Sequence, residues 1–149
     1  LKDVYGNAFF RMKYLDKNPE NFTSILKKDI YNKKALLPQM AWIDSIPPIS
    51  PAKLVPKGFF CIKKLVVKYD KKQQPSDDIF GYVIYKSDKK NLVNIENPEN
   101  IVRFTDSNEI KIEDLNIPTK KRLYIWVTAI DKHQNESSPV GNIKIKKRK

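Results

Sequence analysis

The chain has 149 residues, 40% of them apolar and 11% aromatic, which is enough for one ordinary domain and an appendage. Its 29 Lys and Arg residues against 17 Asp and Glu give a formal charge of +12, so a polyanion is one class of partner to consider. The lysines are spread along the chain and arginine is scarce, so we interpret the charge as a solvated basic surface and do not expect nucleic acid as the partner. No run approaches the roughly 18 apolar residues of a membrane helix, and we expect no membrane insertion.

The N-terminal residues predict a strand followed by a helix. Residues 6–15 begin as a short apolar strand and end as a polar, aromatic loop. Asn18, Pro19 and Glu20 are typical of a helix N-terminus, because they supply a capping oxygen, a fitting first residue and a favourable charge. Apolar residues at helical spacing extend this helix to about residue 31. One strand and one helix cannot bury each other, and the chain begins with Leu without a signal segment, so we expect a piece of a longer protein.

Residues 36–50 are dense in proline and predict an extended linker, because proline disfavours both helix interiors and central strands. The chain therefore divides into residues 1–35, a linker at 36–50 and a second domain at 51–149. The apolar side chains of the linker, Leu37, Met40, Trp42 and Ile43, are expected to pack on a domain surface.

The second domain reads as a mainly β, antiparallel sandwich. Its central strand is predicted at residues 123–131, where β-branched and aromatic residues alternate with period two. Leu123, Ile125, Val127 and Ala129 share the face that we expect in the core. The other strands are predicted at residues 52–55, 60–69, 80–86, 93–95, 102–105, 109–113 and 142–147.

Individual reactive residues give no catalytic or cofactor site. Cys61 lies in an apolar stretch and is expected to be a buried thiol. His133 lies in a turn, and the chain has no second histidine and no other cysteine to build a zinc site with it, so we expect no metal. No glycine-rich phosphate loop is present, and no cofactor is expected.

Three signatures together resemble a fibronectin type III domain over residues 49–147. They are Ile49-Ser50-Pro51-Ala52-Lys53-Leu54, then Phe80-Gly81-Tyr82-Val83-Ile84-Tyr85, and finally Val127-Thr128-Ala129-Ile130-Asp131 followed by Asn135-Glu136-Ser137-Ser138-Pro139. Such domains usually carry a corner tyrosine four residues before the valine of Val-Thr-Ala. Leu123 stands at that position here, which questions the tyrosine corner and leaves the fold unaffected.

The first 48 residues resemble the end of a bacterial glycosyl-hydrolase-like family. The resemblance rests on Gly6-Asn7-Ala8-Phe9-Phe10, the helix from Asn18, and Leu36-Leu37-Pro38-Gln39-Met40-Ala41-Trp42-Ile43-Asp44 before Pro47-Pro48, although Gln39 stands where the family tends to have proline. It implies a TIM-type barrel whose last strand and helix begin this chain, with a C-terminal fibronectin-like module. It also implies an extracytoplasmic, periplasmic or cell-surface location, often as a lipoprotein.

Whether this chain belongs to an active enzyme is left open by its residues. Glycoside hydrolysis needs two carboxyl groups about 5–9 Å apart at the barrel face, and one remaining strand cannot supply both. We therefore assign no catalytic residue. The candidates for substrate contact are Arg11 and Tyr14, near the end of the predicted strand, and Trp42, whose flat ring suits a sugar.

The function expected from the resemblance is that of a non-catalytic accessory module that docks on or orients its own upstream barrel. Met40, Trp42, Tyr124 and Trp126 are the predicted docking surface. One alternative is a carbohydrate- or protein-binding module that uses exposed aromatic side chains, with polysaccharide as the partner. A second alternative is a polyanion-binding basic domain.

Overall fold

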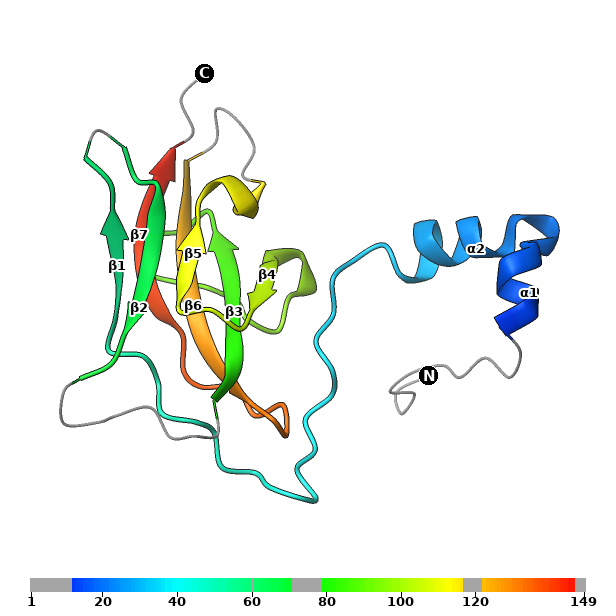
Figure 1. The fold of residues 1–149 in the computed structure, drawn as a ribbon, viewed down its shortest axis with the longest axis horizontal. Coiled ribbons are helices and arrows are strands. Elements are labelled where there is room, and N and C mark those ends of the chain that lie inside the picture. Colours follow the sequence, from blue (N-terminus) through cyan, green and yellow to red (C-terminus); the bar gives the residue numbers. More distant parts are fainter. Residues whose placement is uncertain (1–11, 60, 71–78, 117–121, 147–149) are drawn as a thin grey trace. The chain divides into compact units, whose positions relative to one another are not determined.

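The computed structural model describes residues 12–59, 61–70, 79–116 and 122–146, and the chain divides into two compact units, Leu1–Lys34 and Ala35–Lys149 (Figure 1). The strand predicted within residues 6–10 lies outside the described residues. In the part of the chain that the structure describes, no helix is both long and apolar enough to cross a membrane.

The first unit is helical but irregular. It contains α1 (Met12–Lys17), η1 (Pro19–Asn21), α2 (Phe22–Ile25) and η2 (Leu26–Ile30). Asn18 accepts hydrogen bonds from the Thr23 backbone amide at 2.7 Å and from its hydroxyl at 2.6 Å, so its side chain binds the first turn of α2 and does not cap η1, the turn that directly follows it. The helix is not continuous, because Glu20 and Asn21 have positive φ angles of 51° and 59°.

The loop predicted for residues 12–15 is wrong, because these residues begin α1. Methionine, leucine and lysine dominate this segment, and all three have high helix propensity.

The second unit consists of two antiparallel sheets, as the mainly β prediction requires (Figure 1). One sheet has the order β1-β2-β5 and the other has the order β4-β3-β6-β7. The strands are β1 (Lys53–Lys57), β2 (Lys64–Lys68), β3 (Ile79–Ser87), β4 (Ile101–Thr105), β5 (Glu109–Lys111), β6 (Arg122–Asp131) and β7 (Val140–Lys146). Two 3-10 turns, η3 (Pro98–Asn100) and η4 (Glu113–Leu115), flank β4 and β5.

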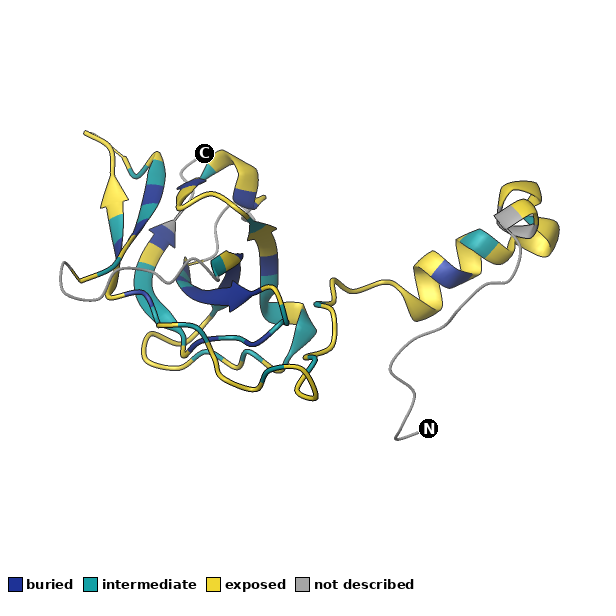
Figure 2. Cartoon of the chain, turned by 60° about the horizontal axis from the view of Figure 1, so that its bottom comes forward, coloured by how far each residue is buried: buried dark blue, intermediate teal, exposed yellow. Residues whose placement is uncertain are grey.

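Strand β6 supplies the centre of the core, as the alternation of its residues predicts. Figure 2 shows that most of the buried residues belong to the sandwich. Ile125, Val127 and Ala129 are fully buried, and Leu123 is nearly so. They belong to one cluster with side chains from the facing sheet, among them Leu65 and Ile110. Apolar burial of this kind is the main stabilising contribution to the fold.

The opposite face of β6 is also covered. Val83, Tyr85 and Ile130 form a second buried cluster, and Leu36 from the linker packs against it together with Trp126. Further cover comes from Val93, Ile95 and Ile101. The sheet β4-β3-β6-β7 is therefore buried on both faces near its centre.

Three local predictions are wrong in the second unit. Residues 61–63 do not belong to the second strand, because β1 and β2 pair Lys57 with Lys64, and residues 61–63 lie in the connection between these two strands. Cys61 lies in that connection and is exposed, so the buried thiol is wrong as well. Residues 93–95 form no strand; Val93 and Ile95 are half-buried against the second cluster without joining a ladder.

Tyr85 joins the second cluster to the turn after β6. Its hydroxyl donates to the Glu136 carboxylate at 2.6 Å, and the Thr128 hydroxyl donates to the same oxygen at 2.5 Å. Burial, and then the bond to Glu136, raise the pKa of Tyr85 above its ordinary value, so the hydroxyl keeps its proton and remains a donor.

Replacing Tyr85 by phenylalanine is expected to lower the free energy of unfolding by about 1.5–2 kcal/mol, because the half-buried Glu136 carboxylate loses a charge-assisted hydrogen bond. Urea denaturation measures the change. Tyr124→Phe is the matched control, since the Tyr124 hydroxyl has no hydrogen-bond partner among the described residues. Equal losses in the two variants would contradict the role given to the Glu136 bond.

Candidate functional site

The linker lies against the turn between β6 and β7, at the lower end of the sandwich in Figure 1. The Met40 amide donates to the His133 carbonyl at 2.9 Å. A short turn follows, in which the Ile43 amide donates to the Met40 carbonyl at 2.9 Å and the Asp44 amide to the same oxygen at 3.3 Å. This turn carries the Asp44 side chain towards β6.

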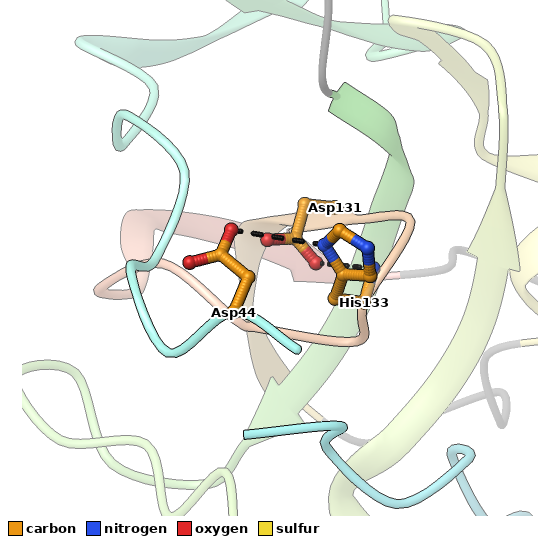
Figure 3. A group of neighbouring side chains, drawn as sticks. All are labelled: Asp44, Asp131 and His133. Carbon is orange, nitrogen blue, oxygen red and sulfur yellow. Dashed lines mark hydrogen bonds and ion pairs between the residues drawn. The ribbon is translucent and has the colours of Figure 1, made fainter. Parts of the chain in front are cut away.

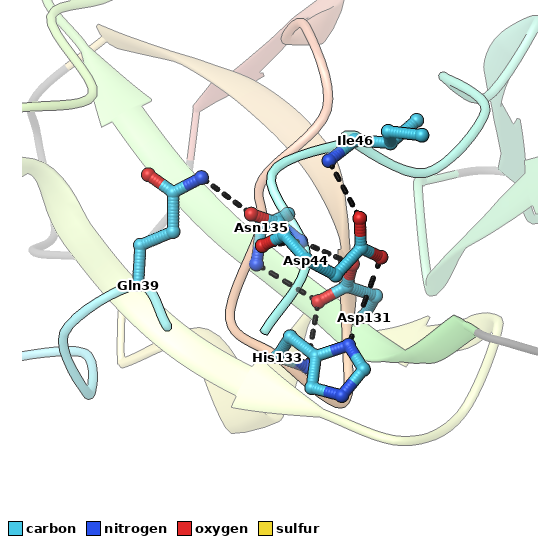
Figure 4. Close-up of polar contacts among 6 residues, drawn as sticks. All are labelled: Gln39, Asp44, Ile46, Asp131, His133 and Asn135. Carbon is cyan, nitrogen blue, oxygen red and sulfur yellow. Dashed lines mark hydrogen bonds and ion pairs between the residues drawn. The ribbon is translucent and has the colours of Figure 1, made fainter. Parts of the chain in front are cut away.

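Asn135 connects the linker to the β6–β7 turn at two points (Figure 4). Its side-chain oxygen accepts from the Gln39 side-chain amide, and its side-chain nitrogen donates to the Asp44 carbonyl at 3.2 Å. That nitrogen also donates to Asp131 Oδ2 at 2.8 Å. Asn135 is fully buried, so these partners take the place of water.

Asp131 shapes the turn from which Asn135 projects. Its Oδ1 accepts from the backbone amides of His133 and Asn135, each at 2.8 Å. Gln134, between them, has a positive φ of 66°. A side-chain oxygen that binds amides two and four residues ahead is the usual way in which aspartate stabilises a turn. The carboxylate is buried but is satisfied by three N–H donors.

Asp44 adds a charged contact to this group (Figure 3). Its Oδ2 lies 3.7 Å from His133 Nδ1, while its Oδ1 accepts from the Ile46 amide at 2.9 Å. One potential ligand atom each from Asp44, Asp131 and His133 lies within 4.8 Å of the others, so these side chains could hold a divalent cation. The bonds already made by Asp131 favour a structural role, and we call Gln39, Asp44, Asp131, His133 and Asn135 the linker clamp.

Of the three predicted substrate contacts, only Trp42 has its side chain among the described residues. Arg11 and the Tyr14 side chain lie outside them, and Tyr14 contributes only its backbone to α1. Trp42 is 79% exposed, so the domain surface on which it is predicted to pack is not that of the sandwich. The reason is that the turn from Met40 to Asp44 is held by backbone and polar contacts and leaves the indole in solvent.

The predicted docking residues occupy two places. Met40 is half-buried at the linker clamp, beside exposed Trp42. Tyr124 and Trp126 are half-buried on the second face of β6. Trp126 packs against the second buried cluster there, and Leu36 of the linker packs against the same cluster. Linker coverage of this face therefore includes Leu36, and it does not include Trp42.

The linker clamp is the part of the site that the sequence analysis missed. Asp131 and Asn135 carry a turn signal, because aspartate and asparagine stabilise turns through their side chains. No local signal joins them to Gln39 and Asp44, which are 96 and 91 residues away from Asn135 in the chain. Such a contact follows only from the folded arrangement.

The chain is similar in sequence to a bacterial glycosyl hydrolase. It is 30% identical over 137 residues to the glycosyl hydrolase YngK of Bacillus subtilis (strain 168), an alignment that covers 92% of this chain and 26% of that protein. The chain thus spans about a quarter of the length of the curated relative that it matches. No family model matches the chain, and no solved structure matches it.

Proposed function

We propose that this chain is the non-catalytic, C-terminal accessory module of a bacterial glycoside-hydrolase-like protein, and that it docks on or orients the catalytic barrel. The observation that carries the proposal is the similarity to a glycosyl hydrolase over nearly the whole chain but only a quarter of that protein. A quarter of a hydrolase without paired strand-end carboxylates fits an accessory part better than a catalytic one.

The strand order supports a fibronectin type III-like assignment for the second unit. A three-stranded and a four-stranded antiparallel sheet enclose one apolar core, with β1, β2 and β5 in one and β3, β4, β6 and β7 in the other. Seven antiparallel strands divided three and four between two sheets are also found in sandwiches of the immunoglobulin class, although in the constant-type domain the fourth strand lies in the sheet of the first, second and fifth. In this proposal residues 1–35 are the end of the barrel and residues 36–50 are the linker.

The linker clamp gives the proposal a mechanism. Flexible linkers leave neighbouring domains free to reorient, and prolines or fixed contacts restrict that freedom. Here the Met40 amide, the Gln39 side chain and the Asp44 carbonyl are all bonded to the β6–β7 turn. The path of residues 39–44 is therefore fixed on the sandwich, and the module begins at a defined point.

The linker also supplies an apolar surface for docking. Its exposed side chains include Leu37 at 69%, Trp42 at 79% and Ile46 at 74%. Large apolar side chains gathered on a short exposed segment mark an interaction surface. We assign this surface to the upstream barrel of the same protein, at an extracytoplasmic location, periplasmic or on the cell surface.

The sequence that precedes Leu1 tests this function directly. Strand–helix repeats that carry carboxylates at the strand ends are expected there, as in a TIM-type barrel. A short leader directly before Leu1 would contradict the proposal.

Trp42→Ala tests the docking surface. In the protein that includes the upstream residues, this variant is expected to lower the melting temperature and to increase hydrogen exchange across residues 39–46, because an apolar contact is lost. In the 149-residue chain the same variant is expected to change stability by less than about 0.5 kcal/mol. Leu92→Ala, at an exposed site on the β3–β4 connection, is the control. If Trp42→Ala and Leu92→Ala behave alike in the longer protein, Trp42 does not dock.

One observation favours the alternative of a binding module. Phe80 and Phe104 are both exposed and stack with ring centroids 5.6 Å apart. Exposed aromatic rings are the side chains that pack on sugar rings. Retardation of the chain in gels that contain neutral polysaccharides, abolished by Phe104→Ala, would support this alternative over docking.

A further inference from the structure

We propose that the lysine-lined hollow at the end of the β1-β2-β5 sheet binds an acidic polysaccharide. The proposal deepens the accessory function and rests on it for the choice of a sugar polymer. We call this hollow the lysine hollow; it is lined by Lys57, Gly58, Ile62, Lys63, Lys64, Lys111, Ile112 and Glu113.

The strand register places three lysines side by side. β1 and β2 pair Lys57 with Lys64, and β2 and β5 pair Lys64 with Lys111. Neighbouring strands are about 4.8 Å apart, so three positive charges cross the sheet in one row. Like charges directly opposite each other on a sheet destabilise it. An anion that binds to such a row offsets the repulsion between the lysines and therefore stabilises the folded protein.

Most of this charge is not neutralised within the chain. Lys64 contacts both carboxylate oxygens of Glu109, at 2.8 and 2.9 Å. Among the residues that the structure describes, no carboxylate lies at ion-pair distance from Lys57, Lys63 or Lys111. Glu113 is the one acidic side chain in the lining. The hollow therefore has a net positive charge that faces solvent.

The shape and floor of the hollow suit a sugar ring. Its volume is about 680 Å³. Ile62 and Ile112 are half-buried, pack on the core and line the hollow, so they give it some apolar surface. Gly58, at the edge of the hollow, has a φ of 146°, and a Cβ there would collide with the Cys61 carbonyl oxygen, so the tight connection between β1 and β2 requires glycine. An acidic sugar has an apolar ring face for the isoleucines and a carboxylate for the lysines.

The chemistry of the lining favours acidic sugars over nucleic acid. Single-stranded nucleic acid is usually held by aromatic side chains that stack on bases and by arginine. Among the described residues that line the hollow there is neither an aromatic residue nor an arginine. Lysine ammonium groups act as point charges and bind carboxylates without requiring planar, paired geometry.

The experiment uses the 149-residue chain with polygalacturonate as the probe and neutral dextran as the comparison. Titration calorimetry at low ionic strength is expected to show binding of polygalacturonate that weakens as salt rises, and no binding of dextran. The double variant Lys57→Gln/Lys111→Gln is expected to bind at least about tenfold more weakly. It keeps Lys64, so the ion pair with Glu109 is preserved.

The control removes two exposed lysines outside the hollow, through Lys89→Gln/Lys90→Gln. The control variant should bind like the unchanged chain. The melting temperature is the second readout, and it shows whether the double variant folds. Because Lys57→Gln/Lys111→Gln relieves repulsion in the row, its melting temperature should not fall. Equal weakening by both double variants, tighter binding of single-stranded DNA than of polygalacturonate, or no binding of polygalacturonate at low salt would each overturn the proposal.

Failure of this test and failure of the accessory function are separable. The upstream sequence decides whether a barrel precedes the chain, and it does not depend on the hollow. Calorimetry on the 149-residue chain decides whether the hollow binds an acidic polymer, and it does not depend on the barrel.

Discussion

Replacing Ile125 by alanine is expected to lower the free energy of unfolding of the sandwich by about 3–4 kcal/mol. Ile125 is fully buried at the centre of β6 and belongs to the main core cluster. Truncation removes apolar contacts and leaves a cavity that the paired strands β3 and β7 cannot close, because both are hydrogen-bonded to β6 at this point. Urea denaturation followed by circular dichroism measures the loss.

Ile46→Ala is the matched control, because the same side chain is removed from a position that is 74% exposed. It should change stability by less than about 0.5 kcal/mol. A small effect of Ile125→Ala, comparable with that of Ile46→Ala, would mean that β6 is not the central strand of the core.

Asn135→Ala is expected to lower the free energy of unfolding by about 2–4 kcal/mol, because several polar groups lose their partners at once. Asp131 Oδ2, the Asp44 carbonyl and the Gln39 side chain all bond to the Asn135 side chain. The variant should also speed hydrogen exchange at Met40, whose amide bonds to the same turn. Hydrogen exchange read by mass spectrometry separates this local release from global loss of stability.

Ser138→Ala lies in the same connection, is exposed and serves as the control. It should leave exchange across residues 39–44 unchanged. If Asn135→Ala destabilises the fold without faster exchange in residues 39–44, the asparagine supports the turn alone and does not hold the linker.

The sequence predicts the sandwich well because its strongest signal is local. In β6 the alternation of small aliphatic residues with larger ones decides the buried face without knowledge of any partner strand. The apolar stretch around Cys61 is wrongly predicted to be a strand for the same reason, because its signal is also local. Its composition is that of a strand, but the pairing of Lys57 with Lys64 makes it a connection, and pairing is not a local property.

The two sites also depend on pairing between distant residues. The linker clamp joins Gln39 and Asp44 to Asn135, and the lysine hollow joins Lys57 and Lys64 to Lys111. Lysines spread along a sequence look like a solvated surface, and only the register brings three of them into one row. The composition therefore gives the net charge of the chain, but it does not show that positive charge is concentrated at one place on the surface.

The linker clamp has a mechanical consequence. Because Asn135 holds Asp44, a pull applied between the linker and the end of β7 is transmitted through the β6–β7 turn and along β7. The residues between Asp44 and Asn135, which include strands β1 to β6, then lie outside the path of the force. Stretching the protein should first break the contacts of Asn135 and only afterwards load β1, so a module tethered in this way resists shear as a short, stiff unit.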